Sequence, residues 1–143
     1  VDIEPDNIPV LLMRANLNFM AEKYEAAIAD CNRVIALDAT NASAYYLAAK
    51  AKKAAGDVLG TIVSLSQAIT IKEDFAEALL LRAEMMLSTR DYKDGLQDIE
   101  KVIGLMPEEE NAFLIRGRLH EALGDDQAAE QVFSPSPYLH REE

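Results

Sequence analysis

The residues best suited to chemistry are two histidines and one cysteine, His120, His140 and Cys31. A zinc site needs several Cys, His or carboxylate ligands at short spacings, and neither histidine has such a partner in the sequence. Nothing around Cys31 would activate its thiol. Ile28 and Val34, three residues to either side, instead predict that Cys31 is a small buried hydrophobic residue. We therefore expect no metal site and no cofactor.

The remaining catalytic patterns are missing as well. The glycines occur singly, so the sequence contains no glycine-rich loop of the kind that holds phosphate groups. Acidic pairs such as Glu109 and Glu110 have the character of surface runs at the start of a helix, where the helix dipole stabilises carboxylates. These observations give no support to an enzyme, and we predict a non-catalytic protein.

Charge and hydropathy restrict the partners. The formal net charge is −11, which repels nucleic acid and anionic membrane surfaces, and half of the residues are apolar. No apolar run approaches the ~20 residues of a membrane span, and no signal-peptide pattern is visible. The expected partner is another protein or a peptide, with no nucleic acid and no membrane insertion; self-association stays open.

The elements that carry these residues follow an internal repeat. Apolar residues recur at helical spacing, and the period-two alternation of strands is nearly absent, so the predicted class is all-α. Three copies align without a gap at an offset of 34, and a fourth is incomplete. The copies are 8–41, 42–75, 76–109 and the partial copy 110–133.

Small residues recur at two places in each copy. The eighth residues are Ala15, Ala49, Ala83 and Gly117, and the twentieth are Ala27, Thr61, Gly95 and Ala129. Small side chains let two helices cross closely, so each copy is predicted to be an antiparallel helical hairpin. Between the two places lie predicted turns at Glu22-Lys23, Gly56-Asp57, Arg90-Asp91 and Gly124-Asp125.

These small residues, together with Tyr24 and Tyr92 at the start of second helices and Pro107 at the end of a copy, resemble the tetratricopeptide repeat (TPR). The resemblance covers residues 1–133. It implies a right-handed superhelical solenoid of helical hairpins whose first helices line a concave face. The sequence departs from the family where a tyrosine is usual in the first helix, since Asn18, Lys52, Met86 and His120 stand there.

The repeat register extends to both ends. Residues 1–7 match the end of a copy, with Pro5 in the place of Pro107, so we expect a preceding repeat. At the other end, Pro135 and Pro137 cannot continue a helix. The last helix is therefore predicted to be short, and residues 134–143 to form an extended tail.

A charged pattern predicts ion pairs inside two hairpins. The seventh residue of a copy is Arg14 in copy one and Arg82 in copy three, and the twenty-third is Asp30 or Asp98. Copy two lacks both charges. Joint presence and joint loss predict Arg14–Asp30 and Arg82–Asp98 pairs with a structural role, because a bidentate arginine–carboxylate pair fixes geometry. Arg116 has no matching aspartate, and we expect it to reach Glu130 or solvent.

The resemblance also implies which residues face the concave groove, where the family usually binds an extended or helical peptide. In copies one to four they are Leu12, Asn16, Phe19, Tyr46, Lys50, Lys53, Leu80, Glu84, Leu87, Leu114, Arg118 and Glu121. The apolar members would form an exposed stripe, a feature that marks binding surfaces. The alternative is that some of them pack against the neighbouring first helix.

Chaperone-binding members of the family hold a peptide's terminal carboxylate with lysine, asparagine and arginine. Asn16 is present here, but Leu12, Leu47, Glu77 and Leu81 occupy the other places. A carboxylate clamp is therefore not expected. The favoured hypothesis is a scaffold that binds an apolar or amphipathic peptide in the groove. The alternatives are a self-assembling solenoid, or an array that recruits substrate to a larger enzyme.

Overall fold

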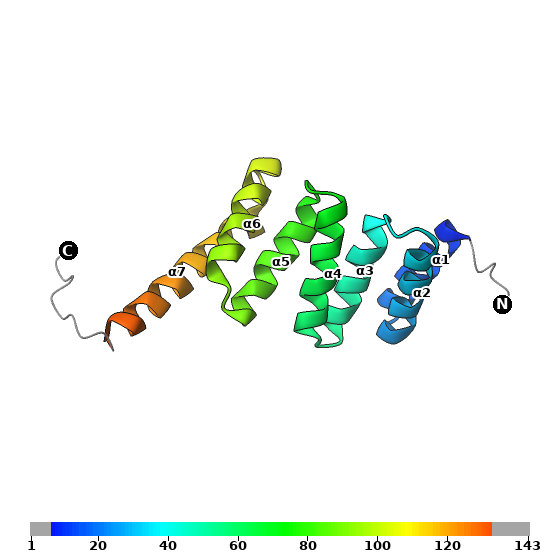
Figure 1. Cartoon of the computed structure of the whole chain (residues 1–143), viewed down its shortest axis with the longest axis horizontal. Coiled ribbons are helices and arrows are strands. Elements are labelled where there is room, and N and C mark those ends of the chain that lie inside the picture. The colour runs from blue at the N-terminus through cyan, green and yellow to red at the C-terminus, as the bar shows by residue number, and fades with distance from the viewer. Residues whose placement is uncertain (1–6, 133–143) are drawn as a thin grey trace.

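Seven α-helices form the part of the chain that the structure describes (Figure 1). The structure is a computed structural model; it describes residues 7–132, with side chains to residue 125. No strand occurs within this range, so the predicted all-α class is confirmed. The helices are α1 (Ile8–Met20), α2 (Tyr24–Leu37), α3 (Ala42–Ala54), α4 (Val58–Ile71), α5 (Ala76–Thr89), α6 (Tyr92–Leu105) and α7 (Glu110–Val132).

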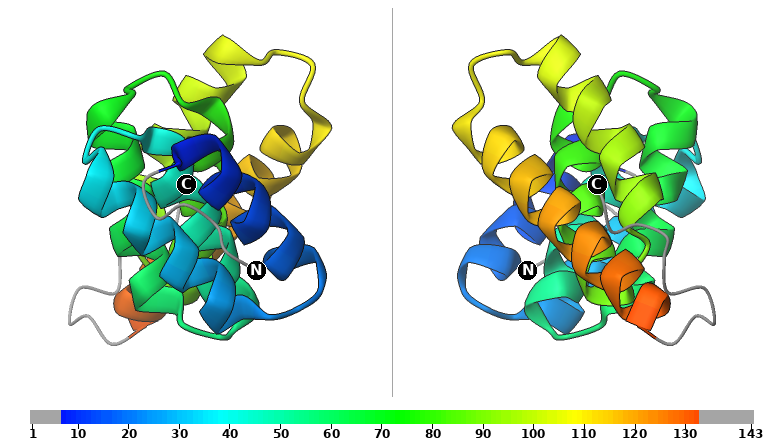
Figure 2. Two further views of the ribbon diagram at one scale, coloured as in Figure 1. Left: turned by 90° about the vertical axis from the view of Figure 1, so that its right-hand side faces the viewer. Right: turned by 90° about the vertical axis from the view of Figure 1, so that its left-hand side faces the viewer.

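The helices pack as a row of hairpins. α1 packs on α2, α3 on α4 and α5 on α6, and each second helix also contacts the first helix that follows it. First helices contact one another as well, α1 with α3 and α5 with α7. Figure 1 shows the hairpins in chain order along the longest axis, and Figure 2 looks along that axis from both ends. Such stacking, in which each unit contacts its neighbours, defines a solenoid.

Side chains at the helix starts determine where several helices begin. Asn7 Oδ1 accepts a hydrogen bond from the Val10 amide at 3.1 Å, and Asn41 Oδ1 accepts one from the Ala44 amide at 3.0 Å. Asp57 caps α4 in the same way through the Gly60 amide. Each cap satisfies an amide that has no partner inside its helix. The caps of α1 and α3 each stand directly before a copy, so the repeat extends to the capping chemistry.

Three hairpin turns use the same backbone conformation at the same place of the copy. The φ angles are 64° at Glu22, 90° at Gly56 and 65° at Arg90. These residues occupy matching places in copies one, two and three, and a left-handed residue reverses the chain directly after a helix. The predicted turns at these three places are confirmed.

The small residues of copies one to three lie where helices approach closely, whereas Gly117 of copy four is exposed and a Cβ added there would meet nothing within 4 Å. Ala15, Ala49, Ala83, Ala27 and Thr61 are fully buried. A Cβ added to Gly95 would stand 2.9 Å from Leu119 Cδ2, so no larger residue fits there without a shift. Gly95 thus lies close both to Met86 on the first helix of its own hairpin and to Leu119 on the helix that follows.

The fourth copy differs from its prediction. α7 runs unbroken from Glu110 to Val132 through the expected turn at Gly124, so the turn and the short last helix are wrong. A second helix folds back only if it buries apolar residues, as Val34 and Ile35 do in copy one. Their counterparts in copy four are Ser136 and Pro137, which provide neither a continuous helix nor an apolar face.

The predicted repeat end at 1–7, apart from Asn7, and the predicted tail at 134–143 lie outside the described residues. Within the described part, no helix is both long and apolar enough to cross a membrane. The largest apolar core runs through copies two to four and includes Leu65, Leu79, Ile99 and Leu119.

Candidate functional site

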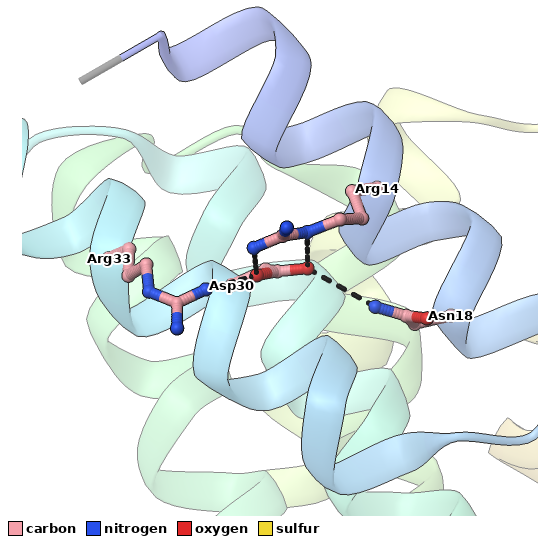
Figure 3. Close-up of polar contacts among 4 residues, drawn as sticks. All are labelled: Arg14, Asn18, Asp30 and Arg33. Carbon is pink, nitrogen blue, oxygen red and sulfur yellow. Dashed lines mark hydrogen bonds and ion pairs between the residues drawn. The ribbon is translucent and has the colours of Figure 1, made fainter. Parts of the chain in front are cut away.

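The residue with the most polar partners is Asp30, on α2. Arg14 donates from Nε to Oδ2 at 2.9 Å and from Nη2 to Oδ1 at 2.6 Å (Figure 3). Asn18 Nδ2 donates at 3.2 Å and Arg33 Nη1 at 2.7 Å. The hydrogen bond to Asp30, more than its charge, raises the pKa of Arg14. The carboxylate is buried and fully occupied by donors, an arrangement suited to holding two helices together.

The second predicted pair also forms. Arg82 Nε and Nη2 donate to the two oxygens of Asp98 at 2.6 and 2.8 Å. This hydrogen bonding, followed by the charges of Asp98 and Asp94, raises the pKa of Arg82. Arg82 Nη1 also donates to Ser66 Oγ at 3.1 Å, which connects copy three to copy two. Both pairs are bidentate, as the sequence predicts, and each joins the first helix of a hairpin to the second.

Copy two contains a polar link that the sequence analysis missed. Lys52 Nζ donates to Ser64 Oγ at 2.9 Å, and Ser64 is buried. Lys52 stands in the place that Asn18 occupies in copy one, and Ser64 stands in the place of Asp30. The pairing of Asn18 with Asp30 shows that these two places meet, so the register contains the signal for the second pair as well.

Arg116 finds a different partner from the one expected. Its Nη1 lies 3.5 Å from Glu100 Oε2 on α6, and its guanidinium carbon lies 5.3 Å from the centre of the Phe113 ring. The side chain of Glu130 lies outside the described residues. Because α6 packs beside α7, an acid on the preceding second helix is in reach. The side chain of Arg116 also stays 36% exposed to solvent, and its contact with Glu130 stays a prediction.

The first helices bring an aromatic and cationic cluster together on the predicted groove. Lys50 Nζ on α3 lies 5.4 Å from the ring centre of Phe19 on α1 and 5.0 Å from that of Tyr46. The Tyr46 ring in turn contacts Phe75, with centres 5.0 Å apart. Burial, and secondarily the charge of Glu77, raises the pKa of Tyr46. Residues from copies one and two therefore form this cluster, and the charge of Glu77 in copy three acts on Tyr46.

An ion pair connects the next two first helices. Lys53 Nζ on α3 lies 3.4 Å from Glu84 Oε2 on α5, and the two side chains remain 43% and 45% exposed. Since Lys50 and Lys53 reach α1 and α5 respectively, three first helices present their predicted groove residues to one another. A pair this exposed contributes little to stability. It marks the position of the groove rather than holding the fold together.

The other predicted groove residues divide into two groups. Leu12, Phe19, Tyr46, Leu80 and Leu87 are half-buried and pack against the apolar core clusters. Leu114 is 52% exposed, and Asn16, Arg118 and Glu121 are exposed too. The expected stripe of exposed apolar residues is therefore wrong except at Leu114. The five half-buried side chains pack between helices and remain partly exposed.

Two hollows of the surface lie elsewhere. One of about 450 Å³ is lined by Tyr45, the loop residue Ala39 and residues of α4. Another, of about 320 Å³, lies beside the Asp30 cluster and includes Arg14 and Arg33. Neither includes a predicted groove residue. The predicted groove residues themselves stand on the four first helices α1, α3, α5 and α7.

Cys31 is the buried residue that the sequence predicts, whereas His120 lies at the surface. Cys31 is fully buried; burial and the charge of Asp30 raise the pKa of its thiol to about 12, against a smaller opposing effect of Lys52. His120 is exposed on α7. Among the described side chains, no three His, Cys, Asp or Glu residues gather in a way that could hold a metal ion.

Comparison with known proteins gives the fold. No family model and no curated protein matches the chain in sequence. Among solved structures it is similar to MamA, with a TM-score of 0.78 and 24% identity over 88% of this chain and 69% of that one. It is also similar to the first TPR domain of Spaghetti (RPAP3), bound to the HSP90 peptide SRMEEVD, with a TM-score of 0.80 and 18% identity over 87% and 98% of the two chains.

A third similar structure is the Yersinia enterocolitica type III secretion chaperone SycD in complex with a peptide of the translocator YopD. Its TM-score is 0.70, with 16% identity over 91% of this chain and 99% of that one. The chain therefore has the fold of TPR domains, the fold that its sequence resembles.

Proposed function

We propose that the chain is a non-catalytic interaction scaffold that binds an apolar or amphipathic peptide segment along the face of its first helices. The observation that carries the proposal is the meeting of Phe19, Tyr46 and Lys50 across α1 and α3. Partly exposed aromatic rings can hold an apolar side chain, and a nearby ammonium group can donate a hydrogen bond to a backbone carbonyl. Leu87 and Leu114 extend this face along the row.

Two similar structures support the peptide class of ligand. The RPAP3 domain is bound to the HSP90 peptide SRMEEVD, and SycD is in complex with a peptide of YopD. They resemble this chain in fold at only 18% and 16% identity, so their ligands indicate a type of partner and not its sequence.

The groove of this chain disfavours a peptide that ends in several acids. Leu12, Leu47 and Leu81 provide no cation where the chaperone-binding members of the family use polar and basic residues, and Glu77 adds a negative charge near Tyr46. The whole chain carries a net charge of −11. Acidic segments would be repelled, so we propose a neutral or basic amphipathic ligand.

A displayed library of random peptides, selected on the full chain, tests the proposal. Peptides with paired apolar residues and neutral or basic flanks should be enriched, and their affinity should fall at least about tenfold for Phe19→Ala with Leu87→Ala, because apolar contacts at the centre of an interface dominate binding. The matched control is Leu59→Ala with Val63→Ala, two exposed residues of α4 outside the groove.

Both double variants are compared after their melting curves show that they are folded at the assay temperature. Equal affinity of the selected peptides for the groove variant and for the wild type would contradict the proposal. So would the loss of binding in the α4 variant.

A further inference from the structure

The face of α1 that points away from the rest of the solenoid carries three exposed apolar residues. Met13 is 63% exposed, Leu17 59% and Met20 69%. Their spacing of four and three residues places them on one side of the helix. We refer to Met13, Leu17 and Met20 as the α1 end face. It is separate from the groove residues described above.

The repeat register shows what is unusual about this face. The counterparts of Met13 in copies two and four are Leu47 and Ile115, which are 8% and 5% exposed. The counterparts of Leu17 in copies two to four, Ala51, Met85 and Leu119, are all buried. Two of the three end-face positions are therefore buried or, at Leu81 of copy three, half-buried in the later copies, and they are exposed only in copy one.

The structure also shows what covers these positions. α2 packs on α3, α4 on α5 and α6 on α7, so the cover is the second helix of the preceding hairpin. Leu47 lies in one cluster with Cys31 of α2. Leu119 lies against Gly95 of α6, so closely that a Cβ at Gly95 would be 2.9 Å from Leu119 Cδ2. Within residues 7–132, α1 packs mainly on α2 and α3, and the three end-face residues stay exposed.

The second helices share a pattern of small and apolar residues. This pattern indicates what kind of helix fits the α1 end face. A small residue at the twentieth place (Ala27, Thr61, Gly95) is followed four residues later by Cys31, Leu65 or Ile99, and seven residues later by Val34, Ala68 or Val102. All nine are buried. The α1 end face offers no charge to such a helix, because the one charged residue of α1, Arg14, is directed to Asp30.

We propose that the α1 end face is a docking surface for one amphipathic partner helix of this second-helix kind. The helix runs antiparallel to α1. Its small residue lies opposite Leu17, and its apolar residues four and seven places later lie against Met13 and the start of α1. The interface continues, at one end of the row, the contact that α2, α4 and α6 already make with the helices that follow them.

A graft tests whether the face accepts such a helix. Residues 91–108, which contain α6, replace residues 1–6, so that Asn7 keeps its capping place and the added helix stands one register before α1. We expect the melting temperature to rise by roughly 5 °C or more, since burial of exposed apolar surface stabilises the folded chain. No rise would overturn the proposal.

The control is Met13→Gln with Leu17→Gln. In the ungrafted chain both residues are exposed, so the melting temperature should change by less than about 2 °C. In the grafted chain the same pair should remove the gain. A gain that survives these substitutions would show that the grafted helix packs elsewhere, which contradicts the proposal.

A measurement in trans does not depend on the folding of the graft. A synthetic peptide of residues 91–107 is added to the full chain labelled with ¹³C at its five methionine methyl groups. The Met13 signal should shift with added peptide, while those of Met85 and Met106 stay in place. Shifts at Met85 or Met106 without a shift at Met13 would contradict the proposal. Concentration-dependent dimers of the chain alone, abolished by Met13→Gln with Leu17→Gln, would assign the face to a second copy and overturn it.

Discussion

Hairpins one and three join their two helices through an arginine and a buried aspartate, whereas hairpin two uses a lysine and a serine. In hairpin one, Asp30 accepts hydrogen bonds from three residues, and in hairpin three Asp98 accepts two from Arg82. In hairpin two, Lys52 reaches the hydroxyl of Ser64. All three links cross from the first helix to the second around the same place, so a polar contact recurs there although the pair that makes it differs.

The hairpins differ in the buried group that loses its partner when the cation is removed: a carboxylate in hairpins one and three, and a hydroxyl in hairpin two. A buried carboxylate without its cation is costly, whereas a hydroxyl without a partner loses one hydrogen bond. The three hairpins should therefore respond unequally to the loss of their cations, in an order that their donor numbers determine.

The largest effect is expected for Arg82→Met. Asp98 is buried, and Arg82 supplies both hydrogen bonds shown for its carboxylate. The free energy of unfolding should fall by about 3 kcal/mol, measured by urea denaturation. The double change Arg82→Ala with Asp98→Ser, which copies Ala48 and Ser64 of hairpin two, should restore more than half of the loss. A double variant no more stable than Arg82→Met would break the comparison.

Arg14→Met should cost less than half as much as Arg82→Met in the same urea titration. Asn18 and Arg33 still donate to Asp30 when Arg14 is absent, so the carboxylate keeps two partners. Equal losses for the two variants would mean that the number of donors does not decide the cost.

Cys31 lies between hairpins one and two, and charged residues of both hairpins affect the pKa of its thiol. Burial and the charge of Asp30 raise its pKa from 9.0 to about 12, while Lys52 lowers it. Above pH 9 the unfolded chain releases this proton and the folded chain keeps it. Stability is therefore complete below pH 9 and is lost as the pH rises toward 12, by up to roughly 1.4 kcal/mol per pH unit. Urea titrations at pH 8, 9 and 10 should show this slope in the wild type and a smaller one in Cys31→Ala; equal slopes would contradict it.

The smallest effect is expected for Lys52→Met. It removes one hydrogen bond to Ser64, and thermal or urea unfolding should show a loss of about 1 kcal/mol. Ser64→Ala should cost less than Lys52→Met, because an alanine leaves no buried hydroxyl without a partner. A loss as large as that of Arg82→Met would show that hairpin two depends on its polar link as strongly as hairpin three does.

The sequence predicts the features that recur at matching places in several copies. The hairpin turns at Glu22, Gly56 and Arg90 and the two arginine–aspartate pairs recur at a fixed interval, so one alignment finds them all. The Lys52–Ser64 pair occurs once and uses a different place in the first helix, and alignment alone did not reveal it. The contact of Arg82 with Ser66 joins two copies, which a comparison of copies with one another does not address.

Burial was harder to predict than position. Phe19, Tyr46 and Leu87 stand on the first helices where the register puts them, yet each is half-buried, because the degree of exposure depends on the size of side chains on the neighbouring helices. The prediction of a turn at Gly124 was wrong for a related reason. A glycine permits a turn, but the apolar face that a returning helix would need is missing from residues 134–137.

The central claim is that a peptide binds along the face of the first helices. The most direct measurement is the amide chemical shift of the full chain, titrated with a library-selected amphipathic peptide. We expect the largest changes at Phe19, Lys50 and Glu84, with little change at Leu59 and Val63 on α4. Changes centred on Leu59 and Val63, with Phe19 and Lys50 unmoved, would contradict it.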